Sequence, residues 1–363
     1  MQPGHERDVV YTYRYLRAAM IALLFMLVFS VGYQWWWETG RTCVLGSISA
    51  YYYTPARTIF VGSLCALGAC LIAYKGHSPA EDVLLNFSGF MAFVVAIVPT
   101  VPDNLCGPNA YSQTLPEIAS AVRNNIWSLI IVTLVSAVTG GIIRWRLWRI
   151  VRAGPRNWWS EVRERRQERL AGITDAEKTE RRWAVVISGL CGAVLAAELI
   201  FFFFVRPRFI ERSHGIAAIT MVAGIILVMV FNALRTEERH EATRGEDSTR
   251  NRKALSAKAY KRIYLIIAGL LVVALCVAVF AAGDYLILVI ELIVIVLFCA
   301  YWGVQTRELW NLREAATTAA TVREVPPEQP VTTQRSLVEQ GSTRPGHVLD
   351  HDVEGRKTQT VAE

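Results

Sequence analysis

The sequence predicts an all-α, polytopic integral membrane protein with about eight transmembrane helices. Of its 363 residues, 53% are hydrophobic and only 19% are charged, and the mean hydropathy is +0.30. The apolar residues form blocks of about 20, the length that a helix needs to cross the hydrocarbon core of a bilayer. They occupy every face of a helix in these blocks, without a polar stripe for water. Because a backbone in lipid must satisfy its own hydrogen bonds, each block is predicted to be a helix.

The eight predicted spans divide the chain into four parts. The spans are residues 17–36, 56–75, 81–101, 118–143, 183–205, 214–235, 263–283 and 286–306. The parts are a first four-helix membrane half (1–143), a basic, Trp-rich cytoplasmic or interfacial segment (144–182), a second four-helix half (183–306) and a disordered cytoplasmic tail (307–363). The first span precedes GYQWWWETG and not a small-residue cleavage motif, so we expect it to remain as a signal anchor.

Helix starts are marked by proline and acidic residues. SPAE, from Ser78, predicts a capping box, with Pro79 in the first turn and Glu81 reaching back. TPAR, from Thr54, predicts the same kind of start for the second span, and Pro116 does so for the fourth.

The distribution of Lys and Arg predicts that both termini are cytoplasmic. Twelve lie in residues 144–182 and nine in 235–262, whereas the loops on the other side carry six. The net charge of +7 is therefore explained by topology, and no fold or motif for nucleic-acid binding is present. We expect anionic lipids at the basic loops. The tail, rich in Thr, Pro, Glu and Gln, is a candidate for binding a protein partner.

Two of the seven cysteines, Cys43 and Cys106, fall in loops on the same external, oxidising side. They are a candidate disulfide, with two unrelated thiols as the alternative. The other five lie in predicted spans and are expected to pack as small apolar residues. There is no CxxC and no spacing typical of a metal site, so no metal and no cofactor is expected.

No catalytic motif is present. None of the six histidines lies in the interior of a predicted span, and His214 comes closest, at the outer start of the sixth. HExxH, GxSxG and phosphate-loop motifs are absent. A histidine-based intramembrane metallohydrolase is disfavoured, and no residue is assigned as catalytic.

Two carboxylates lie inside spans, Glu198 in LAAELIFFFF and Glu291 in ILVIELIVIV. Burying a charge in hydrocarbon costs at least a few kcal/mol, so such residues are candidate functional groups. Both are expected about 8–10 Å below the outer surface, where a shared cavity would bind a proton or a cation. The alternative is that each carboxyl is protonated or paired on its own.

The segment SISAYYYTPARTIF, residues 47–60, is unusually polar and aromatic for this chain. Ser47, Ser49, Tyr52 and Arg57 are candidate ligand-binding residues at the outer surface. The alternative is architectural: residues 51–53 would belong to an aromatic belt at the membrane interface, with Arg57 as an interfacial anchor.

Residues 40–102 resemble a group of bacterial multi-pass membrane proteins with a Ser-x-Ser-x-Tyr-Tyr collar, an arginine, a Phe-Val-Gly helix start and a Tyr-Lys-Gly end. More distantly, they are similar to the FRAG/DRAM type of membrane protein. The resemblance implies a bacterial cytoplasmic membrane and no established activity.

Three functions follow as hypotheses. The first is a permease-like or ligand-binding protein with an outward-facing site. The second is an intramembrane enzyme that acts on a lipid through carboxylates. The third is an accessory subunit that binds cytoplasmic partners. A water-filled cavity across the bundle midplane would favour the first, and a nucleophile or acid–base pair within hydrogen-bond reach at the lipid interface would favour the second. A packed, dry bundle and a partner that co-purifies through the tail would favour the third.

Overall fold

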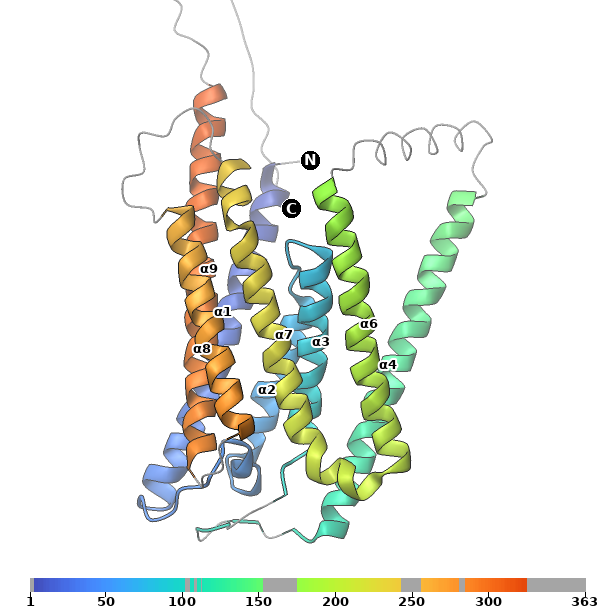
Figure 1. Cartoon of the computed structure of the whole chain (residues 1–363), viewed down its shortest axis with the longest axis vertical. Coiled ribbons are helices and arrows are strands. Elements are labelled where there is room, and N and C mark those ends of the chain that lie inside the picture. The colour runs from blue at the N-terminus through green and yellow to red at the C-terminus, as the bar shows by residue number, and fades with distance from the viewer. Residues whose placement is uncertain are drawn as a thin grey trace, which may run out of the picture. The chain divides into compact units, whose positions relative to one another are not determined.

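A computed structural model describes residues 3–101, 105–107, 110–111, 113–152, 175–242, 256–280 and 285–324. These residues contain eight α-helices and no strand. Chain contacts separate a first unit, Met1–Ala320, from a second, Thr321–Glu363. The helices, drawn in Figure 1, are α1 (Pro3–Tyr33), α2 (Arg57–Ala73), α3 (Pro79–Ile97), α4 (Leu115–Arg152), α6 (Asp175–Phe204), α7 (Arg206–Ala242), α8 (Ala257–Phe280) and α9 (Leu286–Glu324).

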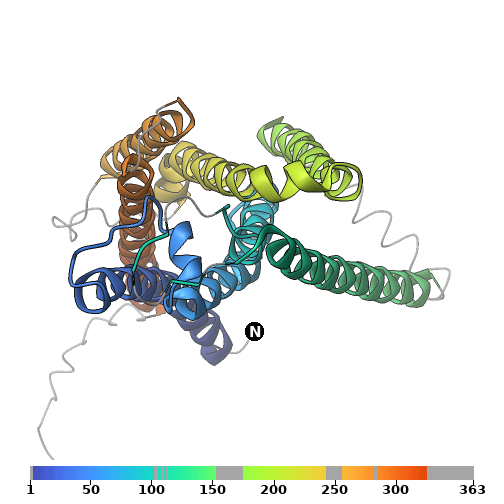
Figure 2. The same ribbon diagram turned by 90° about the horizontal axis from the view of Figure 1, so that it is seen from below.

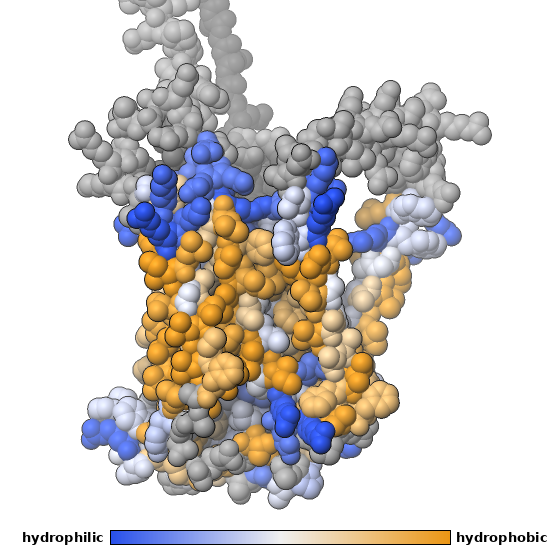
Figure 3. Space-filling model, in the orientation of Figure 1, coloured by the Kyte–Doolittle hydropathy of each residue, from blue (hydrophilic) through white to orange (hydrophobic). Residues whose placement is uncertain are grey.

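Seven of these helices are long and apolar enough to cross a membrane. The eighth, α2, has 17 residues and is therefore about 25 Å long. Figure 3 shows an apolar band across the face of the bundle that it presents, with hydrophilic residues gathered above and below it. The protein is therefore an all-α, multi-pass membrane protein.

Each of the eight predicted spans coincides with one helix, but several helices run further than predicted. α4 and α6 extend into the basic segment, whose middle, residues 153–174, lies outside the described residues. α9 continues to Glu324, so the predicted disorder from residue 307 is wrong at its start. The reason is composition, because the stretch from Arg307 to Glu324 is rich in helix-forming Ala, Leu, Glu and Arg. The tail beyond Glu324, and the turn around Asp284, lie outside the described residues.

α3 is the central helix of the bundle. It packs against α2, α6 and α7, and 67% of its most apolar window is buried, against 6% for α4. Figure 2 shows α4 at the edge of the bundle. α2 and α3 lie close together at Gly68 and Gly89, where a Cβ atom on either residue would lie 2.6 Å from the carbonyl oxygen of the other. Small residues at this crossing permit the close packing that a membrane bundle needs.

The bundle has two ends (Figure 1). The collar end holds residues 39–56, the connection from α3 to α4, and the first turns of α7 and α9. The terminal end holds the start of α1, the α2–α3 turn, the end of α7 and residues 306–310 of α9.

Two of the predicted helix starts are confirmed. The Ser78 hydroxyl accepts a hydrogen bond from the Glu81 backbone N–H (3.1 Å), and the Glu81 carboxylate accepts one from the His77 N–H (2.8 Å). At α4, the carboxylate of Glu117 accepts from the Thr114 N–H (2.8 Å). The predicted start at Thr54 is wrong, because α2 begins at Arg57 and Thr54 instead closes a turn onto the carbonyl of the preceding 3₁₀ helix.

Candidate functional site

The collar segment, which we define as residues 47–54, is an interior element of the fold. Its 3₁₀ helix, Ser49–Tyr53, is buried throughout, and Tyr51, Tyr52 and Tyr53 are 2%, 3% and 1% exposed. The prediction that these tyrosines face an interfacial aromatic belt is therefore wrong. Trp36 and Trp37, which are 47% and 66% exposed, do have the exposure that a belt requires.

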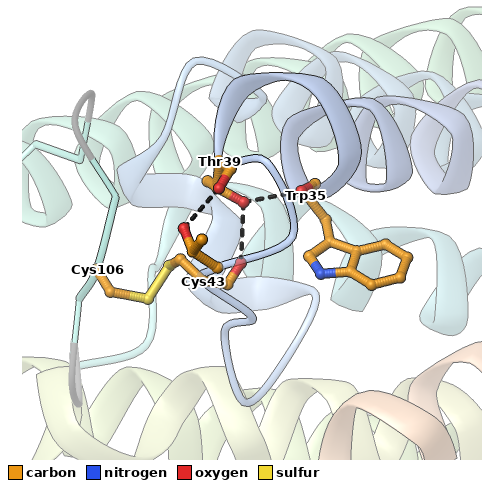
Figure 4. The surroundings of a disulfide bond; sticks show 5 residues. Trp35, Thr39, Cys43 and Cys106 are labelled. Carbon is orange, nitrogen blue, oxygen red and sulfur yellow. Dashed lines mark hydrogen bonds between the residues drawn. A yellow bond between two sulfur atoms is a disulfide. The ribbon is translucent and has the colours of Figure 1, made fainter.

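A tight turn and a disulfide lead the chain from α1 to the collar segment. Gly40 and Arg41 both adopt positive φ angles, of 55° and 66°, and reverse the chain after the π-helical turn Gln34–Glu38. The Thr39 hydroxyl then donates to the carbonyl of Trp35 (2.8 Å), and the carbonyl oxygen of Cys43 lies 3.3 Å from the same hydroxyl, as Figure 4 shows. Cys43 is joined by a disulfide to Cys106, in the connection from α3 to α4. This is the pairing that the sequence placed on one side of the membrane.

The collar segment is hydrogen-bonded to several separate parts of the chain. The Tyr53 hydroxyl donates to the carbonyl of Thr100 (2.6 Å), and the Tyr53 carbonyl accepts from the Tyr111 N–H (2.7 Å). Just before the segment, the carbonyl of Gly46 accepts from the Leu288 N–H of α9 (2.9 Å). Burial raises the pKa of Tyr53 to about 12, so this phenol is a neutral donor at ordinary pH.

Glu291 of α9 is bonded directly to the collar segment. Its Oε2 atom accepts a hydrogen bond from the backbone N–H of Ile48 (2.5 Å), and its Oε1 atom lies 3.2 Å from the Ser49 hydroxyl. No cation pairs with this carboxyl among the residues that the structure describes. A carboxyl at this depth without a counter-ion is unusual in a membrane helix, which supports a functional role for Glu291.

His214 of α7 completes the site from the other side of Ser49. Its Nε2 atom lies 2.7 Å from the Ser49 hydroxyl, and its Nδ1 atom lies 2.6 Å from the carbonyl oxygen of Val98. A carbonyl oxygen can only accept, so Nδ1 carries a proton and Nε2 faces Ser49. Ser49 and His214 are each 5% exposed. The site therefore joins the collar segment to α7 and α9 in the interior.

Hydrogen-bond counting indicates that this site has room for one further proton. The Ser49 hydroxyl has a single hydrogen but faces two acceptors, His214 Nε2 and Glu291 Oε1. Both contacts are hydrogen bonds only when one more proton is present, either on the Glu291 carboxyl or on His214 Nε2. We call Glu291, Ser49 and His214 the proton relay.

The other candidate residues of the segment lie outside the relay. The Ser47 hydroxyl accepts from the backbone N–H of Ala50 (3.1 Å) and so closes a local turn. Arg57 donates to the Tyr52 hydroxyl (2.5 Å), and its guanidinium lies 4.2 Å from the centre of that ring. This pair holds the start of α2 against the collar segment, and it does not reach Glu291 or His214.

The shared site of Glu198 and Glu291 stays a prediction. In the described part of the chain no hydrogen bond or ion pair joins the two carboxylates. Both carboxylate oxygens of Glu198 are buried without a hydrogen bond. The buried Ser213 hydroxyl of α7 lies near this carboxyl. Glu198 therefore lies beside the relay's helix α7 while remaining outside the relay. Counting residues from the helix ends predicts the same membrane depth for both carboxylates. It does not predict the direction in which each side chain points from its helix.

A second buried polar cluster lies at the terminal end. Glu308, which is 0% exposed, accepts from the Tyr264 hydroxyl and lies 3.6 Å from Arg239 Nη2 and 3.4 Å from His240 Nε2. The cluster connects α7, α8 and α9. The acidic side chain, Glu308, lies beside two basic side chains, Arg239 and His240, as expected of a structural network. No group of three or more His, Cys, Asp or Glu side chains in the described ranges is arranged to bind a metal ion.

Sequence reasoning missed His214 as a site residue because its helix was predicted to begin at residue 214. α7 begins at Arg206, and the apolar span within it starts at Arg208. His214 consequently lies about two turns inside the helix, in a position to meet a buried partner. The signal available was RSHG, a polar group directly before an apolar run.

Fold and site together define a multi-pass α-helical membrane protein with a buried Ser–His–Glu hydrogen-bond chain. Comparison with known proteins places it no more narrowly, since no family model, no curated protein and no solved structure matches the chain. The resemblance of residues 40–102 to a bacterial membrane protein family stays a prediction.

Proposed function

We propose that this protein is a permease-like protein of the cytoplasmic membrane, in which proton binding at the relay controls the position of the collar segment. The observation that supports it most is the arrangement of Glu291, Ser49 and His214 around one exchangeable proton. A proton-linked permease needs a titratable group in its interior that also holds a movable element in place.

Loss of the relay proton would weaken the collar's attachment. Without it, the Ser49 hydroxyl can donate to only one of its two acceptors, and two lone pairs then face each other at the second contact. An unpaired buried acceptor costs about 1–3 kcal/mol. Proton release and detachment of the collar segment from α7 or α9 are thereby coupled, and by linkage an open collar binds the proton less tightly.

The proposed orientation sets the collar end outside the cell and both termini in the cytoplasm. The Lys and Arg distribution supports it, as does the Cys43–Cys106 disulfide at the collar end, because such bonds persist in oxidising compartments. In this orientation the relay faces the external solution through the collar segment.

The test is uptake by proteoliposomes of the full-length protein, using a panel of labelled small solutes with and without a pH gradient. Wild type is expected to take up at least one solute faster when the gradient is present. Glu291→Gln and Ser49→Ala should lose this stimulation, while Ser47→Ala, a serine two residues away that bonds only within its own turn, should keep it. Equal stimulation in all four proteins would exclude the relay as the coupling site.

The Ser49–His214 contact also favours a second candidate, a lipid-directed enzyme with Ser49 as nucleophile and His214 as base. The Oγ–Nε2 distance of 2.7 Å and the anchoring of Nδ1 on Val98 O are the geometry that activates a serine. The buried position of Ser49 requires the collar segment to move before a substrate carbonyl can reach it. A fluorophosphonate probe separates the candidates, because covalent labelling that disappears in Ser49→Ala supports the enzyme, and no labelling supports the permease.

A further inference from the structure

A small basic pocket lies at the terminal end, away from the relay. It has a volume of about 70 Å³ and is lined by α1, the α2–α3 turn and α9. Four basic side chains line it, Arg14, Arg17, Lys75 and His77, and no acidic residue is among the described residues of its lining.

Arg17 is a buried cation that forms no ion pair with the residues that the structure describes. The residue is 5% exposed, and its guanidinium donates to the Tyr74 hydroxyl and lies 5.1 Å from the centre of the Tyr74 ring. Its Nε atom is buried without a hydrogen-bond partner, and no carboxylate pairs with it in the described ranges. A buried charge normally requires a partner of opposite sign, because its desolvation otherwise costs several kcal/mol.

The remaining basic residues divide into two kinds. Lys75 pairs with Asp82 (2.8 Å), and His77 lies 3.7 Å from Glu81, so the α2–α3 turn supplies its own acids. Arg14, one turn before Arg17 on α1, lies 3.6 Å from the centre of the Trp310 ring. An aromatic ring orients a guanidinium without neutralising it. Neither arginine forms an ion pair in the described ranges, so both guanidinium groups are available to an anion in the pocket.

The size and donors of the pocket fit a phosphoryl group. Its volume is several times the ~10–15 Å³ that a cavity needs to hold one water, whereas pockets for drug-sized ligands have about 300–1,000 Å³. Guanidinium groups bind phosphate oxygens with paired N–H donors, which Arg17 Nε and Nη atoms can supply. We propose that this pocket binds one phosphoryl group, carried by an anionic phospholipid headgroup or by a free phosphate. The site is separate from the basic loops and from the relay.

Binding is tested with the full-length protein by two arms that distinguish the sources. In detergent, inorganic phosphate is titrated by calorimetry. In nanodiscs, thermal stability is compared between phosphatidylcholine alone and phosphatidylcholine with phosphatidic acid. Saturable phosphate binding supports the proposal with a soluble source, and stabilisation by phosphatidic acid without phosphate binding supports it with a lipid source.

Variants decide whether the pocket is responsible. Arg17→Gln and Arg14→Gln are each expected to weaken binding about tenfold, the loss of a charge-assisted hydrogen bond, and Arg17→Lys should restore only part of it. Arg14→Gln keeps the test decisive if Arg17→Gln does not fold. Arg41→Gln is the matched control, since Arg41 also lies over a tryptophan, Trp36, but at the collar end. Absence of binding in both arms, or equal losses in Arg41→Gln and the pocket variants, would overturn the proposal.

Discussion

The Ser49 hydroxyl lies 2.7 Å from the Nε2 atom of His214, across 165 residues of sequence, and this contact fastens the collar segment to α7. Val98 O holds the far side of the imidazole at 2.6 Å. The histidine is thereby fixed in one tautomer, and its Nε2 atom faces a serine that Glu291 also contacts. Three segments of the chain meet at one hydroxyl group.

Ser49 and His214 should show energetic coupling in a double-mutant cycle. Ser49→Ala and His214→Gln remove the same hydrogen bond, so the double variant should lose about 1 kcal/mol less stability than the sum of the single variants. Unfolding in detergent measures this. The cycle of Ser47→Ala with His214→Gln is the control and should be additive, because Ser47 bonds only to Ala50. Additivity in both cycles would mean that the Ser49–His214 bond contributes nothing.

Substitutions of Glu291 should separate its two roles, hydrogen bonding and proton exchange. Gln can accept from the Ile48 N–H and donate to Ser49 Oγ, so it mimics the protonated carboxyl. Ala can do neither. Hydrogen exchange of the collar peptide, which contains the Ile48 amide bonded to Glu291, is the measurement. After correction for the intrinsic increase of exchange with pH, the exchange rate of the collar peptide should rise with pH in wild type. It should stay low in Glu291→Gln and be high at every pH in Glu291→Ala. Identical protection in all three proteins would contradict the relay.

The helices could be predicted from the sequence, whereas the site could be predicted only in part. Long apolar blocks have no other stable form in lipid, so each predicted span is a helix. Glu291 and Ser49 were singled out because a carboxyl in a span and a serine in an apolar chain are costly without a partner. Their partner, His214, could not be found this way, because helix rotation and long-range contacts leave no local pattern. The collar tyrosines illustrate the same limit, since an amphipathic ring suits an interface and a polar interior equally well.

Loss of the Cys43–Cys106 bond should destabilise the collar end. The bond closes a separation of 63 residues, for which chain entropy predicts about 4 kcal/mol. Cys43→Ser is therefore expected to lower the unfolding temperature and to increase hydrogen exchange of the collar segment. A reductant should do the same to wild type and leave Cys43→Ser unchanged. An equal response of both proteins to the reductant would show that another thiol accounts for it.

The α2–α3 crossing should tolerate no Cβ atom. In Gly89→Ala the new methyl group would lie 2.6 Å from the Gly68 carbonyl oxygen and 2.8 Å from Ile72, an overlap that costs about 1–3 kcal/mol. Gly62 of α2 is the matched control, since a Cβ there meets nothing within 4 Å. Gly62→Ala should be neutral or stabilise by about 0.5–1 kcal/mol, as alanine does in helices. The unfolding curves of Gly89→Ala and Gly62→Ala should therefore move in opposite directions. Similar losses of stability in the two variants would contradict the close approach of α2 and α3.

The stability of the collar end should fall in alkaline solution because of Tyr53. Its pKa is raised from 10.0 to about 12, chiefly by burial, so the folded protein favours the neutral phenol. Above pH 10 the unfolded chain loses this proton before the folded one does, and stability declines as pH rises from 10 to about 12. Below pH 10 the contribution is fully present. In Tyr53→Phe the hydrogen bond to Thr100 is lost at every pH, but the alkaline decline should be shallower than in wild type. Unfolding curves of the two proteins at several pH values measure the change in stability. The difference in tyrosinate absorbance between the two proteins measures the ionisation of Tyr53. Parallel declines in stability would show that another group is responsible.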